Sequence, residues 1–171
     1  MIVLETERLI LRRLAEDDAP FILELLNDPA FLRYIGDKGV RTLDGARDYL
    51  RSGPLASYER FGFGLYLVEL ADGGAAIGTC GLLKRDTLED PDVGFAFLPA
   101  YRRQGYALEA ASAVLAHGRN DFGLERIVAV VSPENESSIK LLGKLGLGFE
   151  GRVRLSEEGE EIYLFGPSIE P

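Results

Sequence analysis

PDVGFAFLPAYRRQGYALEAA, residues 91–111, carries the strongest structural signal in this chain of 171 residues. It opens with an apolar run of strand length at 93–98, and Pro99 ends that run. A short basic turn containing Gly105 comes next, and a helical pattern rich in Ala and Leu starts at Tyr106. The sequence therefore predicts a strand, a positively charged turn and the start of a helix in direct succession.

A strand, a basic turn and a helix start together form a geometry that binds phosphate. The first backbone N–H groups of a helix have no partner within it, and the helix dipole favours an anion there. Gly105 lets a ligand approach the backbone closely, and Arg102 and Arg103 can pair with phosphate oxygens. The alternative is an ordinary strand–turn–helix with solvated arginines, because short glycine motifs are weak signals when taken alone.

Length and composition limit the classes of protein that fit. With 46% hydrophobic and 27% charged residues, the chain is expected to fold as one domain with a substantial core. Its formal net charge of −9 argues against nucleic acid as a partner, because DNA binding depends on a basic surface. The same acidic balance is compatible with an amine-bearing substrate. Cys80 is the single cysteine, which excludes an intrachain disulfide and a cysteine-rich zinc site.

The first residues, MIVLETERL, carry acidic charge and no sustained apolar run. They match neither a signal peptide nor a membrane anchor. No other segment is apolar for long enough to span a bilayer. We therefore expect a cytoplasmic protein with no membrane partner.

Hydrophobic periodicity and turn residues divide the rest of the chain. Strands are expected at residues 5–13 (edge-like), 63–70, 75–83, 126–131, 149–155 and 161–165. Helices are expected at residues 16–27, 42–60, 107–122 and in a short segment from 132–135 to 143–146. Residues 31–40 are expected to be irregular and 85–92 to form an acidic loop. This order predicts an α/β-type mixed sheet with helices on both faces, in which the helix 107–122 connects two parallel strands.

Three groups of residues, in family order along the chain, resemble the GNAT N-acetyltransferases. They are Thr6-Glu7-Arg8-Leu9 with Leu11-Arg12, then Asp92-Val93-Gly94-Phe95 with Tyr101-Arg102-x-x-Gly105-Tyr106-Ala107-x-Glu109-Ala110, and then Asn135-x-x-Ser138 with Leu145-Gly146 and Phe149-Glu150-Gly151. The turn Arg102-x-x-Gly105-x-Ala107 is similar to the family's acyl-CoA pyrophosphate loop, Arg/Gln-x-x-Gly-x-Gly/Ala. The resemblance covers essentially the full length and favours the RimJ/RimL-like subgroup, which acetylates ribosomal-protein N-termini.

The resemblance implies a single GNAT domain over residues 1–171, with a mostly antiparallel central sheet and a splayed pair of parallel strands. It also implies acetyl-CoA as co-substrate and no metal. The gap between the splayed strands would leave the backbone of Ala96, Phe97 and Leu98 free to pair with the pantetheine arm. The residues expected to wrap the pyrophosphate are Arg102, Arg103, Gln104, Gly105, Tyr106 and Ala107. Asn135 would contact the cofactor, although an Asn at this place is as readily explained as a helix N-cap.

The implied reaction moves the acetyl group directly to a primary amine in a ternary complex. A protein N-terminal amine is one candidate acceptor. Asp92 is the candidate base, with Glu89 and Asp90 nearby, and a solvated acidic loop is the alternative. Ser138 is a candidate cofactor contact and proton donor to the departing thiolate, since Leu142 stands where many relatives have a tyrosine. Phe31 and Tyr34 are expected to shape the acceptor site, and the acidic loop to favour amines.

Other functions stay open at this stage. One alternative is an acetyltransferase for a small amine such as an amino sugar, a polyamine or an antibiotic, and another is a CoA-binding regulator with a degenerate site. The sequence allows a monomer or a homodimer, with acetyl-CoA and an amine acceptor as partners. Three residues are interpreted as structural: Cys80 as a small buried residue, Glu109 as a helix-dipole partner, and His117 as a lone histidine with no second ligand nearby in sequence.

Overall fold

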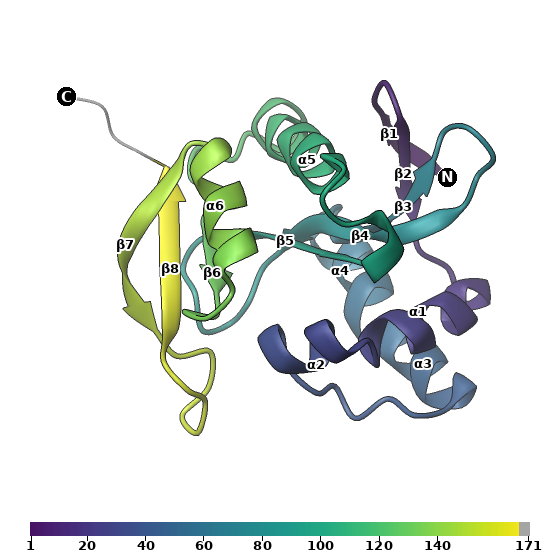
Figure 1. Cartoon of the computed structure of the whole chain (residues 1–171), viewed down its shortest axis with the longest axis horizontal. Coiled ribbons are helices and arrows are strands. Elements are labelled where there is room, and N and C mark those ends of the chain that lie inside the picture. The colour runs from purple at the N-terminus through teal and green to yellow at the C-terminus, as the bar shows by residue number, and fades with distance from the viewer. Residues whose placement is uncertain (168–171) are drawn as a thin grey trace.

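The computed structural model describes residues 1–167 and places their strands in two sheets (Figure 1). The larger sheet is antiparallel and runs in the order β1 (Ile2–Glu5), β2 (Leu9–Arg13), β3 (Leu65–Leu70), β4 (Ala76–Leu83) and β5 (Asp92–Phe97). The smaller sheet is also antiparallel, in the order β6 (Ala129–Val131), β8 (Ile162–Pro167) and β7 (Leu147–Val153). The predicted mixed fold with a mostly antiparallel sheet is confirmed.

The two sheets touch where β5 and β6 begin. Val93 N donates to Val128 O at 2.9 Å, and Val128 N donates to Pro91 O at 3.0 Å. These bonds accompany a parallel bridge between Asp92 and Val128, after which the two strands join different sheets. The predicted splayed pair of parallel strands is therefore present, closed at the Asp92 end and open toward the end of β5.

Helices cover both faces of the larger sheet (Figure 1). On one face lies α5 (Tyr106–Phe122), and on the other lie α1 (Ala19–Leu26), α2 (Pro29–Tyr34), α3 (Leu43–Leu50) and α4 (Ala56–Phe61). The short helix α6 (Glu136–Lys144) packs beside the smaller sheet. None of the helices in residues 1–167 is both long and apolar enough to cross a membrane.

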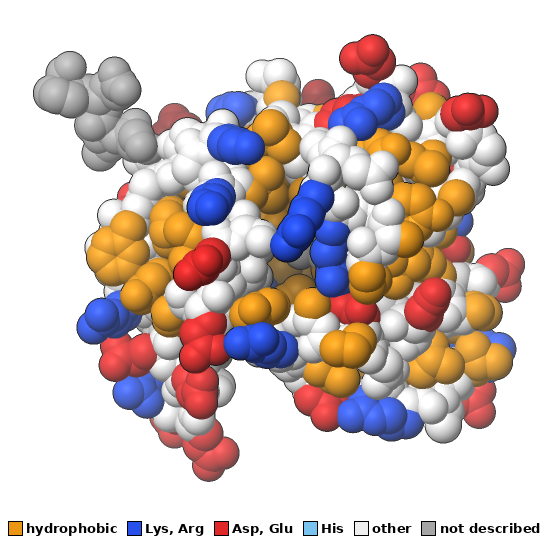
Figure 2. Space-filling model, viewed as in Figure 1, with side chains coloured by type: hydrophobic (Ala, Val, Ile, Leu, Met, Phe, Trp, Pro, Cys, Tyr) orange, Lys and Arg blue, Asp and Glu red, His pale blue; other side chains and the backbone are white. Residues whose placement is uncertain are grey.

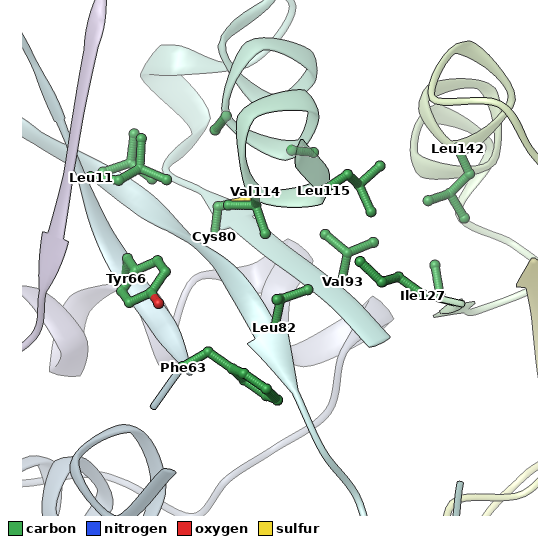
Figure 3. Packing of buried hydrophobic residues seen from close by; sticks show 14 of the residues in the cluster. Leu11, Phe63, Tyr66, Cys80, Leu82, Val93, Val114, Leu115, Ile127 and Leu142 are labelled. Atoms are coloured by element: carbon green, nitrogen blue, oxygen red, sulfur yellow. The ribbon is translucent and has the colours of Figure 1, made fainter. Parts of the chain in front are cut away.

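The alternation of side chains along the sheet divides the buried residues into two cores. Val93 and Phe97 of β5 belong to the core under α5, whereas Ala96 packs against the core under α1 and α3. Figure 3 shows Val114 and Leu115 of α5 directed toward the sheet in the first of these cores. Side chains on the two faces of β5 therefore pack in different cores, so alternate residues of this strand lie on opposite faces of the larger sheet.

Cys80 and His117 are both buried, which confirms the prediction of a buried Cys80. Cys80 is fully buried, and burial raises the pKa of its thiol far above the usual range. The His117 ring lies between the Tyr66 hydroxyl, 3.2 Å from Nε2, and the Asp121 carboxylate, 2.5 Å from Nδ1. Both side chains are thus accounted for by packing and local hydrogen bonds.

Three expected segments differ from the structure. Residues 5–13 were expected as one edge-like strand, but they are the end of β1, a turn and β2, because Thr6 Oγ1 accepts from Leu9 N at 3.1 Å and reverses the chain. The helix expected at 42–60 is interrupted by a π-helical turn, Arg51–Leu55, which contains Pro54. Residues 31–34, expected as irregular, complete α2, whose N-cap Asp28 accepts from Phe31 N at 3.2 Å.

The strand expected at 126–131 is also shorter than predicted. Its β-branched run is buried except for the half-buried Val130, but only residues 129–131 join the smaller sheet in the described chain. The preceding residue, Val128, makes the bridge to the larger sheet. Val128 thus pairs with the larger sheet, and residues 129–131 pair with the smaller one. Strand propensity alone does not predict which sheet a residue joins.

Candidate active site

The turn between β5 and α5 adopts an unusual backbone conformation. Gly105, the N-cap of α5, has φ = 83°, and Arg103 has φ = 62°. A positive φ is strained for a residue with a side chain, and Arg103 is the one non-glycine residue in 1–167 that adopts it. No side chain of the described residues caps α5, so its first N–H groups are available to an anion.

Side chains from the N-terminal hairpin hold this turn in place. Glu109 accepts from Thr6 Oγ1 at 2.5 Å and from Arg8 Nε at 2.7 Å. Arg8 also donates from Nη1 to Gln104 O at 2.9 Å, and its guanidinium lies 4.4 Å from the centre of the Tyr106 ring. Glu109, predicted as a helix-dipole partner, is therefore also an anchor between the hairpin and α5. Thr6 and Arg8 belong to a segment that resembles the family, but the sequence did not indicate that they contact Glu109.

Arg102 is engaged by protein groups instead of being free for phosphate. Its Nε donates to Phe97 O at 3.0 Å, and its Nη2 donates to Asp28 Oδ2 at 2.7 Å. Asp28 is only 8% exposed and is the residue that caps α2. In this structure the guanidinium thus ties the turn to α2, and the pairing of Arg102 with phosphate oxygens stays a prediction.

The expected main-chain contacts along β5 also need a correction. Leu98 N donates to Ile77 O at 2.9 Å, so this group is not free to pair with a pantetheine arm. In an antiparallel strand the N–H and C=O of one residue point to the same side, and those of the next residue point to the other side. Since Val93 N points to Val128 and Leu98 N to β4, the N–H groups of Phe95 and Phe97 face the gap, whereas the main-chain groups of Ala96 point to Thr79 of β4. The main-chain pairing expected for Ala96 and Leu98 is therefore wrong. Phe97 was among the residues predicted for the site and Phe95 was not, although the alternation of the strand could have indicated it.

A cavity of about 510 Å³ lies beside the gap, on the face of the sheet that carries α1, α2 and α3. It brings together six residues that were predicted for the site from distant parts of the sequence: Phe31, Tyr34, Asp92, Ala96, Asn135 and Ser138. Residues of the turn 102–107 are absent from its lining within the described chain. Figure 2 shows a hollow at the centre of the molecule, with Lys and Arg side chains around it.

Asp92 is a buried carboxylate in the wall of this cavity. It is 1% exposed, Oδ1 accepts from Arg85 Nε at 3.0 Å, and Oδ2 has no hydrogen-bond partner among the described residues. Burial raises the pKa of Asp92, while the charge and hydrogen bond of Arg85 oppose that rise. Such a carboxylate is more basic than an exposed aspartate.

The expected acidic wall is absent from the described lining of the cavity. Asp90 pairs with Arg126 at 2.9 Å, and neither Glu89 nor Asp90 lines the cavity. Of the acidic loop, Arg85 and Asp92 are the two residues that do. Glu89 and Asp90 therefore do not line the cavity, and an attraction of amines by this loop stays a prediction.

The first turn of α6 forms the other side of the cavity. The side chain of Asn135 accepts from Ser138 N at 3.3 Å, which confirms the N-cap alternative for this residue. Ser138 is half-buried and lines the cavity one turn before Leu142. Leu142 is 1% exposed and packs in the core under α5, so this place on α6 offers no proton donor.

Comparison with known proteins places these features in a family. The family model described as an acetyltransferase (GNAT) domain matches residues 8–148. The N-acetyltransferase YoaA of Bacillus subtilis, itself uncharacterized, is 32% identical over 153 residues, which cover 89% of this chain and 86% of YoaA. A GNAT-family acetyltransferase from Bacillus anthracis has a crystal structure with a TM-score of 0.78 and 26% identity, covering 97% of each chain.

A third comparison concerns the fold alone. RimL, a ribosomal L7/L12 alpha-N-protein acetyltransferase solved in complex with coenzyme A, superposes with a TM-score of 0.83 over 99% of this chain and 98% of RimL. The two sequences are only 16% identical. The arrangement of sheets and helices is thus shared with a coenzyme A-binding protein, whereas residue roles need their own argument.

Proposed function

Because this chain belongs to the acetyltransferase (GNAT) family, we propose that residues 1–171 form one domain that acetylates a primary amine held in the cavity. The observation that carries the proposal is the gap between β5 and β6. On one side of it lies an uncapped helix N-terminus, and on the other lies a cavity with a buried carboxylate. The last four residues of the proposed domain lie outside the described part of the chain.

The residues around the gap fit acetyl-CoA, which supplies an activated acetyl thioester when bound. The N–H groups at the start of α5 and the positive φ of Gly105 suit a pyrophosphate, because both bring the main chain close to an anion. Arg103, whose neighbour Arg102 is tied to Asp28, is the arginine of this turn that we assign to phosphate. The N–H group of Phe97 or Phe95 is suited to the pantetheine or the thioester carbonyl.

Asp92 is proposed as the base that prepares the amine. An ammonium group has no lone pair for attack, so a proton must leave the amine first. The oxygen Oδ2 of Asp92 has no other partner among the described residues, and the raised pKa of the carboxyl makes it a better acceptor. A general base can take the proton directly or through one water molecule.

Ser138 is proposed as the proton donor to the departing thiolate. Its hydroxyl lines the cavity in the first turn of α6, where the helix dipole also favours negative charge. A thiol has a pKa of about 8.5, so its thiolate is already a fair leaving group and a weak donor is enough. Leu142, one turn later, has no proton to give.

A thiol-release assay tests the proposed function. The protein is incubated with acetyl-CoA and a panel of primary amines and short peptides, and free coenzyme A thiol is measured over time. The expected result is acceptor-dependent release that Asp92→Asn strongly reduces. If the protein is stabilised by coenzyme A but no amine accelerates release, it is a coenzyme A-binding regulator and the proposed function fails.

A further inference from the structure

The charge of the cavity wall differs from that of the whole chain. The chain carries a formal net charge of −9, yet the lining contains Arg33, Lys38 and Arg85 against two carboxylates, Asp92 and Glu160. A site built for an acceptor with several positive charges would present the opposite balance. The positive balance of the cavity wall therefore favours a ligand that carries an anionic group.

Arg85 has binding capacity that the protein does not use. A guanidinium carries five N–H donors in a planar fork that fits a carboxylate, and Asp92 takes the one on Nε. The groups on Nη1 and Nη2 have no hydrogen-bond partner in residues 1–167, and the side chain is partly exposed at the cavity. Arg85 can thus hold Asp92 with one edge and a second carboxylate with the other.

Lys38 is a second cation without a counter-ion in the described chain. Its neighbour Asp37 is already paired with Arg41 at 2.7 Å. The side chain is accessible, yet the protein gathered around its ammonium lowers the pKa of Lys38, and the charge of Arg85 lowers it further. Two like charges therefore face one cavity, and an anion between them would relieve their repulsion.

We propose that the acceptor is an amine that also carries a carboxylate, and that Lys38 and Arg85 bind this carboxylate. The inference rests on the proposed acetyl transfer and names its substrate class. Because Arg85 contacts Asp92 directly, a carboxylate on Arg85 lies close to the proposed base, and the amine to be deprotonated must lie close as well. An amino acid, or a peptide with an acidic residue beside its N-terminus, has this arrangement.

Arg33 is a less suitable partner for the carboxylate. Its side chain is 65% exposed, stacks 4.9 Å from the centre of the Tyr34 ring and lies 3.9 Å from Glu134. It therefore stands at the mouth of the cavity with interactions of its own. A polyamine is also disfavoured, since its second ammonium would meet Lys38 and Arg85.

Matched pairs of acceptors test the inference. Tyrosine is compared with tyramine, which lacks only the carboxylate, and the dipeptide Ala-Glu amide with Ala-Gln amide. Spermidine is the cationic probe. We expect kcat/KM to favour the carboxylate in at least one pair by about tenfold or more, which corresponds to about 1.4 kcal/mol. The favoured pair identifies the source as a free amino acid or an acidic peptide.

Variants then assign the preference to a residue. Lys38→Met should reduce the ratio of kcat/KM within the favoured pair about tenfold, while Lys144→Met, an exposed lysine outside the cavity, leaves that ratio unchanged. Lys38→Glu should invert the ratio and improve turnover of spermidine. Lys38 is accessible and makes no ion pair in the described chain, so these variants are expected to fold.

Two results would overturn the inference alone, and a third would overturn the proposed function as well. Equal or better turnover of the amines without a carboxylate defeats it, as does a preference that survives Lys38→Met, and both leave acetyl transfer intact. Absence of turnover with every amine, despite coenzyme A binding, defeats the proposed function and this inference together.

Discussion

The turn 102–107 and the cavity on the α1–α3 face are built in different ways. The turn is one continuous segment, and the role proposed for it depends on main-chain N–H groups and on the backbone angles of Arg103 and Gly105. The cavity takes its lining from several elements, among them α1, α2, β5, α6 and the turn between β7 and β8, and the role proposed for it depends on side chains. A local, main-chain site can be recognised from a motif, whereas an assembled side-chain site requires the fold.

The largest expected effect concerns the main-chain site. Gly105→Val adds a β-branched side chain at φ = 83°, where its Cβ would also lie 3.2 Å from Nη2 of Arg8. We expect the stabilisation by coenzyme A to disappear, a loss of about 2.7 kcal/mol at a ligand concentration of 100 Kd. Thermal unfolding with and without coenzyme A measures it.

A control separates backbone strain from ligand binding. Gly73→Val introduces a side chain at φ = 87°, an equally unfavourable angle, in the turn between β3 and β4. This variant should lose stability yet keep the full shift with coenzyme A. Normal coenzyme A binding by folded Gly105→Val would show that the turn is not a main-chain site.

The second prediction concerns the side-chain site. Asp92→Asn keeps the shape of the side chain but removes the proposed base, so kcat should fall about 10²- to 10⁴-fold. The shift in melting temperature with coenzyme A should be retained, since Asp92 lies outside the turn 102–107. Unchanged turnover would transfer the proton-accepting role to solvent.

The pH profile sharpens this prediction. Burial raises the pKa of Asp92, so the acidic limb of kcat/KM should lie above the ordinary aspartate value of about 3.9. Ionised Asp92 is disfavoured in the folded state, so its contribution to stability is present below the ordinary pKa and is lost as pH rises through the raised one. The unfolding free energy of the wild type, measured relative to that of Asp92→Asn, should therefore decrease over this pH range.

Local features of the fold could be predicted from the sequence, and contacts between distant segments could not. The strand, turn and helix of residues 91–111 follow from local periodicity and from Gly105, and the structure contains all three. Lys38 and Arg85 could not be assigned to the cavity, because their segments meet only after α2, α3 and the larger sheet have packed. The partner of Asp90 could not be predicted for the same reason, since Arg126 belongs to a distant segment.

The third prediction tests a side chain at the start of α6. Ser138→Ala removes the proposed proton donor and should lower kcat by about tenfold, at the low end for general acid catalysis. Ser137→Ala, an exposed serine one residue earlier, should have no effect and is the matched control. Binding of acetyl-CoA should weaken less than turnover falls. Wild-type turnover by Ser138→Ala would mean that the thiolate leaves without this hydroxyl.

The smallest expected effect concerns the contact that joins the two sites. Arg102 of the turn donates to Asp28, which also caps α2, the helix that carries Phe31 and Tyr34 into the cavity. Asp28→Asn retains the cap, because Asn is as good an N-cap as Asp, but removes the negative charge that faces Arg102. The position of α2 should become less well defined, so KM for the acceptor should rise about fivefold, equivalent to about 1 kcal/mol. Affinity for coenzyme A, which depends on the main chain of the turn, should change less.

In a double-mutant cycle with Arg102→Gln, the second substitution should add little to the first if the pair acts as a unit. Additive effects on acceptor KM would instead show that the turn and the cavity, although adjacent, work independently.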